Sequence, residues 1–529
     1  MMMSGGGRMV PMDMNMPMLP GLEGAVPVVG PFMLGTMIDP ATLPEARPSL
    51  AVPLSNMDTL DISVSMVRRT IAGHEMLGYN GQYPGPLIQA PQNATVIVRV
   101  KNEIEMPTTI HWHGIRIDNR FDGVPGLTQE AIERDETFTY EVRVPDAGMY
   151  WYHPHVREDV QQDLGLYGNL LVTSADPNYY GPAHREEVFV LDDILMDDQG
   201  ALPWGEESPT HALMGRFGNV MMVNGETNHQ MEVRQGEVVR FHLTNVANSR
   251  TFNVTFGNAA MKVIASDVSR FEREQLVGSI VIGPAERYVV DVRFDQPGEV
   301  AIANTIQAIN HFRGEFYPHV DTLSLVTVSD QSADPEVSMA FETLREHSDV
   351  VREIRPLRAH FGREPDHELV TTVRVQNLHQ SIVLSMESDT LYAAPMEWND
   401  AMPMMNWLST ADEVTWILED VTTGAQNDEI DWSFQVGDIV KMRIHNKPDS
   451  FHPMNHPIHI HGQRFLVVSI DGVENQNLVW KDTAILPVGS AMDVLVEMSN
   501  PGEWMMHCHI AEHLHAGMML SFTVNDKAP

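Results

Sequence analysis

The chain has 529 residues, 43% of them apolar, and its 72 acidic and 34 basic side chains give a formal net charge of −38. That length is too great for one compact core and favours about three domains of roughly 150 residues each. A surface this acidic repels phosphate backbones and anionic lipids, so we expect no nucleic-acid partner and favour cationic or neutral substrates. We expect no membrane insertion, because no uninterrupted apolar run reaches the ~18 residues of a spanning helix, and the N-terminus shows no signal peptide.

Residues 1–50 are rich in methionine, glycine and proline. Met9, Met12, Met14, Met16 and Met18 all lie in this stretch. Because such a composition cannot pack a hydrophobic core, we predict a tail that is disordered or loosely attached.

A pattern of two elements then occurs three times. The first is a small turn followed by alternating apolar residues that end in Asn: APQNATVIVRVKN (90–102), VRQGEVVRFHLTN (233–245) and QVGDIVKMRIHN (435–446). The second is a similar alternation that runs into a Pro/Gly turn: ETFTYEVRVPDAG (136–148), ERYVVDVRFDQPG (286–298) and AMDVLVEMSNPG (491–502). Alternation with a period of two and many β-branched residues predicts strands.

The similar spacing of the two elements in each copy predicts an all-β chain of three consecutive β-sandwich domains. We place them at 51–180, 181–335 and 336–529, after the tail at 1–50. The segment from about 331 to 366 mixes charge and proline without alternation, so we interpret it as the linker before the third domain.

Four His-x-His pairs occur at matching points of the first and third copies, in HWHG (111–114), HPH (153–155), HPIHIHG (456–462) and HCH (507–509). The second copy has TFNV (251–254) and ANT (303–305) at these points, so we predict that its domain is a spacer without metal ligands. Side chains alternate along a strand, so both imidazoles of a pair face the same way. Eight converging imidazoles suit three metal ions, and imidazole ligands with O₂ chemistry favour copper.

Cys508 is the one cysteine of the chain and lies between two of these histidines. Its sulfur therefore points to the opposite face of the strand, where we expect it to join His456 and His513 around a fourth metal, with Met518 as a weak axial ligand. Such a set describes a blue-copper electron-transfer site. The run His507-Cys508-His509 then connects the two sites through a few covalent bonds.

With these motifs, in this order, the sequence resembles the multicopper oxidases over about residues 60–525, and most of all the bacterial three-domain members, laccase-like or cuprous oxidase-like. The resemblance implies three cupredoxin-like Greek-key domains and four coppers per chain. It implies an enzyme that takes single electrons from a reduced substrate at a type 1 copper and reduces O₂ to water with four electrons at a trinuclear cluster. The implied ligands are His111 and His459 for the type 2 copper, His113, His153, His155, His461, His507 and His509 for the type 3 pair, and His456, Cys508, His513 and axial Met518 for the type 1 copper.

The resemblance also implies a periplasmic or secreted protein, and we expect a monomer. Asp122, in FDGVPG, matches an acidic residue that in the family helps to deliver protons, so with Cys508 it is a predicted catalytic residue. The alternative is an ordinary Asp-Gly turn. Many bacterial members have a second acid just after the second type 1 histidine, where this chain has Leu514, and Glu512 precedes that histidine instead.

The motifs leave the electron donor open between a phenol or aromatic amine, as in laccases, and Cu(I), as in copper tolerance. The chain has 35 methionines, and Met386, Met396, Met402, Met404 and Met405 cluster ahead of the third domain's copper strands. Thioethers suit Cu(I), although methionine also serves as flexible packing. A non-catalytic copper-binding or storage protein and a copper nitrite reductase are alternatives from other classes, and neither requires all four His-x-His pairs.

Overall fold

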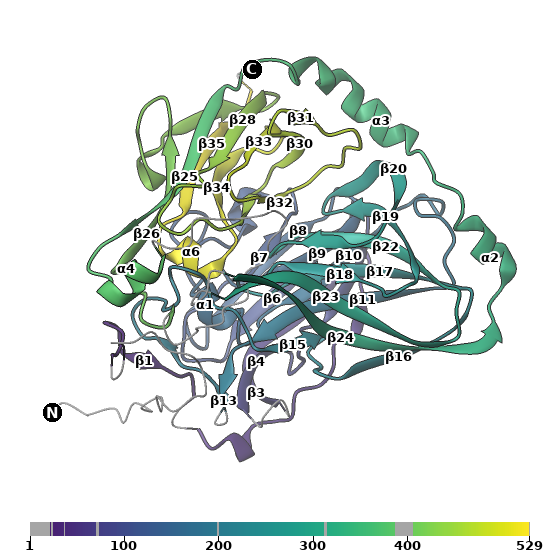
Figure 1. Cartoon of the computed structure of the whole chain (residues 1–529), viewed down its shortest axis with the longest axis horizontal. Helices are drawn as coiled ribbons and strands as arrows, with labels where there is room; N and C mark the ends of the chain where they lie inside the picture. The colour runs from purple at the N-terminus through teal and green to yellow at the C-terminus, as the bar shows by residue number, and fades with distance from the viewer. Residues whose placement is uncertain are drawn as a thin grey trace.

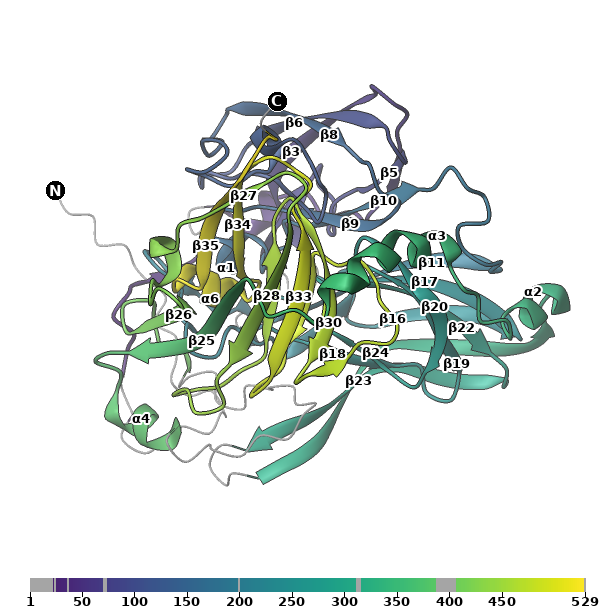
Figure 2. The same cartoon turned by 90° about the horizontal axis from the view of Figure 1, so that it is seen from above.

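The computed structural model describes residues 22, 25–35, 38–69, 74–197, 200–310, 315–386 and 406–527. Strands dominate, and each third of the chain forms its own pair of sheets. In Figure 1 the green-to-yellow strands of the last third lie beside the teal strands of the middle third, and Figure 2 shows the purple-to-blue first third adjoining both. The prediction of three consecutive all-β sandwiches is confirmed.

The first sandwich combines a four-stranded sheet, β4–β3–β6–β8, with a five-stranded sheet, β2–β5–β10–β9–β7. Its core is built from alternate residues of both sheets, with Trp112 and Tyr152 fully buried between them. The strands are β2 (Ala51–Pro53), β3 (Thr59–Arg69), β4 (His74–Tyr79), β5 (Leu87–Pro91), β6 (Thr95–Asn102), β7 (His111–His113), β8 (Thr137–Arg143), β9 (Gly148–His153) and β10 (Gly168–Thr173).

The second sandwich combines a six-stranded sheet, β15–β11–β17–β22–β19–β20, with a five-stranded sheet, β16–β24–β23–β18–β21. Phe241 and Phe252 lie in its core. The strands are β11 (Arg185–Ile194), β15 (Val220–Val223), β16 (His229–Gln235), β17 (Glu237–Asn245), β18 (Phe252–Thr255), β19 (Ala260–Ser266), β20 (Ser269–Val277), β21 (Ile280–Ile282), β22 (Arg287–Phe294), β23 (Gly298–Asn310) and β24 (Glu315–Ser332).

The third sandwich combines a six-stranded sheet, β26–β25–β28–β33–β30–β31, with a five-stranded sheet, β27–β35–β34–β29–β32. Trp416 and Trp504 are buried in its core. The strands are β25 (His367–Val375), β26 (Val414–Asp420), β27 (Trp432–Gln435), β28 (Ile439–Asn446), β29 (His456–Ile460), β30 (Arg464–Ile470), β31 (Val473–Glu474), β32 (Thr483–Leu486), β33 (Ala491–Glu497), β34 (Gly502–Cys508) and β35 (Met519–Asn525).

The sequence repeat corresponds to a structural repeat. Its first element is β6, β17 or β28, and its second element is the antiparallel neighbour β8, β22 or β33. The Asn that ends each first element ties down the loop after it, because its amide group donates to two backbone carbonyls that lie beyond the strand. The acceptors are Met106 and Ile132 for Asn102, Arg250 and Ile282 for Asn245, and Met454 and Leu486 for Asn446.

Part of the segment 1–50 is attached to the body of the protein. β1 (Pro31–Phe32) pairs with β14 (Trp204–Gly205) of the middle third, and Leu22 is buried in the core of the third sandwich. Burial of apolar side chains and strand pairing hold this part, so the expectation of a disordered or loosely attached tail is wrong for it. Residues 1–21, with Met9 to Met18, lie outside the described residues.

The described α-helices are short, with at most seven residues each. In Figure 1, α2 and α3 run along the outside of the molecule, within the segment interpreted as a linker, and Ile354 of α3 packs against Trp480 of the last third. Among the described helices, none is long and apolar enough to cross a membrane. The remaining elements are α1 (Glu158–Gln161), α2 (Pro335–Ala340), α3 (Ser348–Ile354), α4 (Gln380–Met386), α6 (Ala511–His515), η1 (Pro40–Thr42), η2 (Asn119–Phe121), η3 (Arg355–His360), η4 (Asn427–Glu429), β12 (Met196–Asp197) and β13 (Gly200–Ala201).

Candidate metal centre

The histidine pairs of each sandwich are brought together by strand register. β7 and β9 pair with His111 opposite His153, and β29 and β34 pair with His459 opposite His507. Directly opposed residues share one face of a sheet. The four pairs of the sequence therefore become two groups of four imidazoles, one on each sandwich.

These two groups meet across the boundary between the first and third sandwiches. The ring centroids of His113 and His459 are 3.8 Å apart, and those of His155 and His507 are 5.4 Å apart. His113 and His509 are also neighbours, with ring centroids 4.9 Å apart. All eight rings are buried, at 7% exposure or less. The structure thus brings all four His-x-His pairs to one space, as the sequence predicts.

The nitrogen atoms that face this space are available to a metal. Six of them are buried without a hydrogen-bond partner: Nε2 of His111, His153, His155, His459 and His509, and Nδ1 of His113. The other two, Nε2 of His461 and of His507, lie 3.0 Å from each other. Buried polar atoms are nearly always paired, so a cluster of unpaired nitrogens fits bound cations.

The outward nitrogens are held by the protein. His111 Nδ1 donates to the Asp122 carbonyl at 2.7 Å, and His507 Nδ1 donates to the Cys508 carbonyl at 2.9 Å. A bond of this kind fixes the tautomer and turns the other nitrogen toward the metal. Burial also lowers the pKa of His509 to about 3, which keeps this ring in the neutral, metal-binding form.

The eight rings form three groups of three imidazoles, and His113 belongs to two of them. Within each group the potential ligand atoms lie within 4.8 Å of one another, and none of the groups among the described residues uses a residue from 181–335. The groups are His111 with His113 and His459, His113 with His153 and His509, and His155 with His461 and His507.

Cys508 lies at the centre of a separate group on the other face of β34. Its Sγ is 3.6 Å from Nδ1 of His456 and 3.8 Å from Nδ1 of His513. Burial raises the pKa of the Cys508 thiol, so in the absence of a metal this sulfur is protonated. Met518 is fully buried in the same core, and its carbonyl accepts from the Cys508 N–H at 3.1 Å. Two imidazoles, a thiol and a neighbouring methionine fit the soft, trigonal ligand set of a blue-copper site.

This second group is closed to solvent. His456 and His513 are 1% and 0% exposed. The indole of Trp416, on β26, lies against both rings, and the backbone of Leu213, from the middle third, contacts His513. The residues that the structure describes therefore leave an organic molecule no direct access to these imidazoles.

Asp122 is fully buried between the two histidine groups. Its Oδ2 accepts from His461 Nδ1 at 2.8 Å, and its Oδ1 is 3.3 Å from His111 Nδ1. Burial alone would raise the pKa of this carboxyl, but His461 and His111 outweigh it and lower the pKa well below its usual value. Asp122 also ends η2 and precedes Gly123, so it is a turn residue as well as a partner of two candidate ligands.

Several contacts of the centre have no signal in the sequence. Glu158, on α1, has its Oε1 atom 2.7 Å from His155 Nδ1 and also contacts His515, a residue without a predicted role. Glu512 accepts from the Ser249 hydroxyl at 2.9 Å, and burial raises its pKa to about 7. Leu514 packs in an apolar cluster with Val124. The spacing His-x-x-Glu from 155 to 158 is a weak hint, and the other contacts depend on chain segments far apart in sequence.

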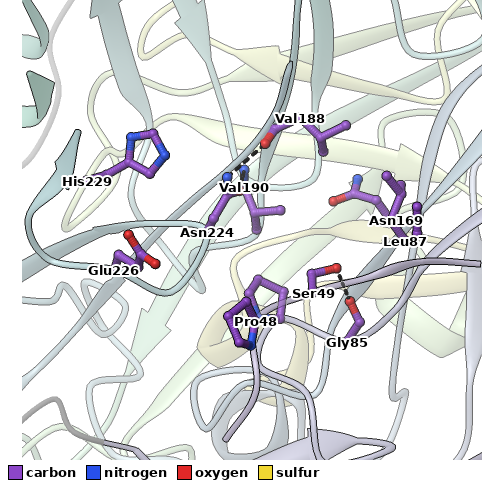
Figure 3. Close-up of a pocket in the computed structure, with 12 residues that line it drawn as sticks. Pro48, Ser49, Gly85, Leu87, Asn169, Val188, Val190, Asn224, Glu226 and His229 are labelled. Atoms are coloured by element: carbon purple, nitrogen blue, oxygen red, sulfur yellow. Dashed lines mark hydrogen bonds between the residues drawn. The ribbon is translucent and has the colours of Figure 1, made fainter. Parts of the chain in front are cut away.

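A hollow of about 240 Å³ lies between residues of the first and middle thirds, and its lining is drawn in Figure 3. It is lined by residues such as Leu87 and His229, and none of the predicted copper ligands lines it. The Asn224 side chain there is already bonded to the backbone of Val188 and Val190, so it offers little to a bound donor. Of the predicted methionine cluster, Met396, Met402, Met404 and Met405 lie outside the described residues.

Comparison with known proteins agrees with this geometry. Family models described as multicopper oxidase match residues 63–177, 189–322 and 398–528. The chain is 26% identical to the multicopper oxidase MmcO of Mycobacterium tuberculosis, over 84% of this chain and 82% of the relative. It is 26% identical to Laccase-1 of Botryotinia fuckeliana, over 85% of this chain and 79% of that protein.

Among solved structures, the fold is similar to that of a multicopper oxidase from Campylobacter jejuni described as a metallo-oxidase. The TM-score is 0.68 at 19% identity, with 92% of this chain and 97% of the other covered. Three family matches in chain order, three sandwiches and two buried histidine sites lead to one conclusion: the chain belongs to the multicopper oxidase family and is a copper-dependent oxidoreductase that uses O₂.

Proposed function

We propose that the protein oxidises a reduced substrate by single electrons at a type 1 copper and reduces O₂ to water with four electrons at a trinuclear copper cluster. The observation that carries this proposal is the convergence of eight buried imidazoles on one space, six of them with a nitrogen that has no hydrogen-bond partner, beside a separate thiol group. Copper, when bound, supplies the one-electron steps and the reduction of O₂.

The grouping of these ligands supports four coppers per chain. His111 and His459 would hold the type 2 copper, and His456, Cys508, His513 and Met518 would hold the type 1 copper. The type 3 pair takes one ligand group made of His113, His153 and His509 and a second made of His155, His461 and His507.

The chain's own residues then have distinct tasks. Cys508 connects the two sites, because its peptide neighbours His507 and His509 both face the cluster while its sulfur faces the other way. Asp122 orients His461 and His111. Its position between these rings also supports the delivery of protons, which the reduction of O₂ consumes.

For the donor we propose two candidates, the first a laccase-type range of phenols and aromatic amines, as the name of the relative Laccase-1 suggests, and the second Cu(I), as the metallo-oxidase title of a solved structure suggests. The burial of His456 and His513 favours the second candidate, because a small ion needs less access than an aromatic ring. A net charge of −38 also attracts cations.

Oxygen uptake by the copper-loaded full chain separates these possibilities. The donors are Cu(I), a phenol and an aromatic amine, each with the Cys508→Ser variant as control. A Cu(I) preference that survives chelation of free copper supports the metallo-oxidase, and fast phenol turnover without a Cu(I) advantage supports the laccase. Copper binding without O₂ uptake from any donor would point to storage, and about two coppers per chain would point to a nitrite reductase.

We also propose domain boundaries near 50/51, 180/181 and 335/336. They are supported by the gap between β10, which ends at Thr173, and β11, which begins at Arg185, and by α2, which begins at Pro335 just after β24. A monomeric state and a periplasmic or secreted location stay predictions.

A further inference from the structure

One imidazole of the cluster is turned the opposite way from the others. His113 points Nε2 outward, 3.0 Å from Asp482 Oδ1 and 2.9 Å from Thr483 Oγ1, and points Nδ1 into the shared space. The other rings of the cluster present Nε2 instead. The side chains that contact Nε2 of His113 are therefore the candidates for what fixes this ring orientation.

The hydrogen-bond pattern defines the tautomer of His113. The Thr483 hydroxyl donates its single proton to Asp482 Oδ1 at 2.8 Å. It can then only accept from a neighbouring imidazole, as the Asp482 carboxylate also does. Nε2 of His113 must carry the hydrogen, which leaves the lone pair of Nδ1 free to face the metal.

Asp482 is itself held by the middle third of the chain. Arg287, at the start of β22, donates to both carboxylate oxygens, Nη1 to Oδ1 at 2.7 Å and Nη2 to Oδ2. Such a bidentate pair is directional as well as strong. Arg287 Nε also donates to the Met149 carbonyl of the first sandwich at 3.1 Å. One buried chain of contacts thus runs through all three sandwiches to His113.

Two further observations fit this arrangement. The Asp482 carbonyl accepts from His459 Nδ1 at 2.8 Å, so the same residue holds the two rings that stack 3.8 Å apart. Gly114 follows His113 with φ of +81°, and a Cβ atom there would lie 2.3 Å from Asp482 Oδ2 and 2.7 Å from Arg287 Nη2. The glycine of HWHG therefore leaves room for the ion pair.

We propose that Arg287 is a positioning residue of the copper cluster, which acts through Asp482 to turn His113 so that Nδ1 faces the metal. The inference rests on the proposed function, because it assumes that His113 is a ligand. It gives the second sandwich, predicted to be a spacer, a share in building a site to which it contributes no ligand.

A purely structural role for the pair is the competing explanation, and the chain offers a matched control for it. Lys481 is also buried and forms ion pairs with Asp267 and Glu286 of the middle third, at 3.0 Å each, one residue from Asp482. Its ammonium group also donates to the Ser266 hydroxyl, and none of these three partners is an imidazole. Asp267 also accepts from the Arg287 backbone N–H at 2.8 Å. Lys481→Met therefore breaks a neighbouring link between sandwiches but keeps the Arg287–Asp482 ion pair and every contact of the imidazoles.

The test compares copper-loaded full chains of the wild type, Arg287→Lys, Asp482→Asn and Lys481→Met. Lysine keeps the charge but lacks the fork, and the amide introduced by Asp482→Asn can donate to Nε2 of His113, which leaves the hydrogen on Nδ1. We expect both changes to weaken copper binding at the cluster about 10- to 100-fold. They should also uncouple the type 3 pair, so that its copper adds a signal in electron paramagnetic resonance to those of the type 1 and type 2 copper. The blue absorption of the Cys508 site stays as an internal reference. Lys481→Met should lower the melting temperature alone.

Full copper content and an unchanged resonance spectrum in Asp482→Asn would overturn the proposal, whether or not that variant is less stable. If Arg287→Lys fails to fold, Asp482→Asn decides, since it keeps the side-chain volume. If the wild type itself binds only the one copper of the Cys508 site, the proposed function is wrong. A loss of copper in the two variants alone leaves the proposed function intact and supports the role of Arg287.

Discussion

The indole of Trp416 lies against the imidazole of His513, with ring centroids 4.1 Å apart and an interplanar angle of 32°. The indole Nε1 donates to the Ala212 carbonyl at 2.8 Å, so one side chain connects the middle third of the chain to the thiol site. Trp416 is fully buried. It forms part of the cover that separates this site from solvent, and it is therefore a point at which donor access can be tested.

Replacing Trp416 by alanine should open the site to larger donors. We expect kcat/KM for a bulky phenol to rise about tenfold relative to Cu(I), equivalent to ~1.4 kcal/mol in the barrier. The cavity should also cost about 3–5 kcal/mol of stability. Trp416→Phe keeps most of the cover and is the matched control. An unchanged donor ratio in Trp416→Ala would mean that the donor does not approach by this side.

Replacing Cys508 by serine should abolish the blue absorption of the protein. A hydroxyl is a hard, weak ligand at the place where the Cys508 sulfur lies 3.6 Å and 3.8 Å from the two imidazole nitrogens. Copper content should fall by about one per chain, as measured by elemental analysis. Met518→Leu is the companion variant, and it should stay blue with a higher reduction potential. If the Cys508→Ser protein remained blue, the assignment of Cys508 as a type 1 copper ligand would be wrong.

Replacing Asp122 by asparagine should slow the reduction of O₂ by about 10² or more, the usual range for a lost acid–base group. The amide cannot accept equally from His461 and His111, which both face this carboxylate. Asp118→Asn is a nearby control, because Asp118 is exposed and its carboxylate caps η2 and pairs with Arg120 rather than with an imidazole. Stopped-flow reoxidation of the reduced enzyme measures the effect, with copper content determined in parallel. Equal rates in the two variants would reduce Asp122 to a turn residue.

Stability should depend on pH through Asp192, a buried carboxyl on β11 that accepts from the Tyr167 hydroxyl. Burial first, and then the neighbours Asp193 and Asp163, raise its pKa well above the usual value. The folded state therefore keeps this proton where the unfolded state has lost it. The free energy of unfolding falls as pH rises above the unfolded pKa of about 3.9, by up to ~1.4 kcal/mol per pH unit, until the folded pKa is reached.

In the Asp192→Asn variant the free energy of unfolding should not show this fall with rising pH. Its melting temperature should exceed that of the wild type at pH 8 and approach it at pH 4, in the presence of a chelator so that copper binding does not contribute. Asp330→Asn is the control, since Asp330 is exposed. Parallel pH profiles for the wild type and Asp192→Asn would show that Asp192 is ionised in the fold.

Local pattern was enough to predict the three sandwiches and the direction of the paired imidazoles. Alternation along a strand places His111 and His113 on one side, and the repeat predicts that β6 and β28 have equivalent partners. Strand alternation and the repeat could not predict the orientation of His113 or the burial of the thiol site. They depend on Arg287 and Trp416, which reach the site only after separate sandwiches have packed together.

The imidazoles of the cluster come from two ends of the polypeptide, and the strand with Cys508 is completed close to the C-terminus. When only the first sandwich has been synthesised, half of the eight imidazoles are present. A chain that ends before β34 lacks the last two of them. Half of the imidazoles lie on or directly after β29 and β34, so the cluster can take up its full set of coppers only after these late strands have paired. Synthesis of the ligand set and loading of the metal are therefore separated in time by the order of the strands.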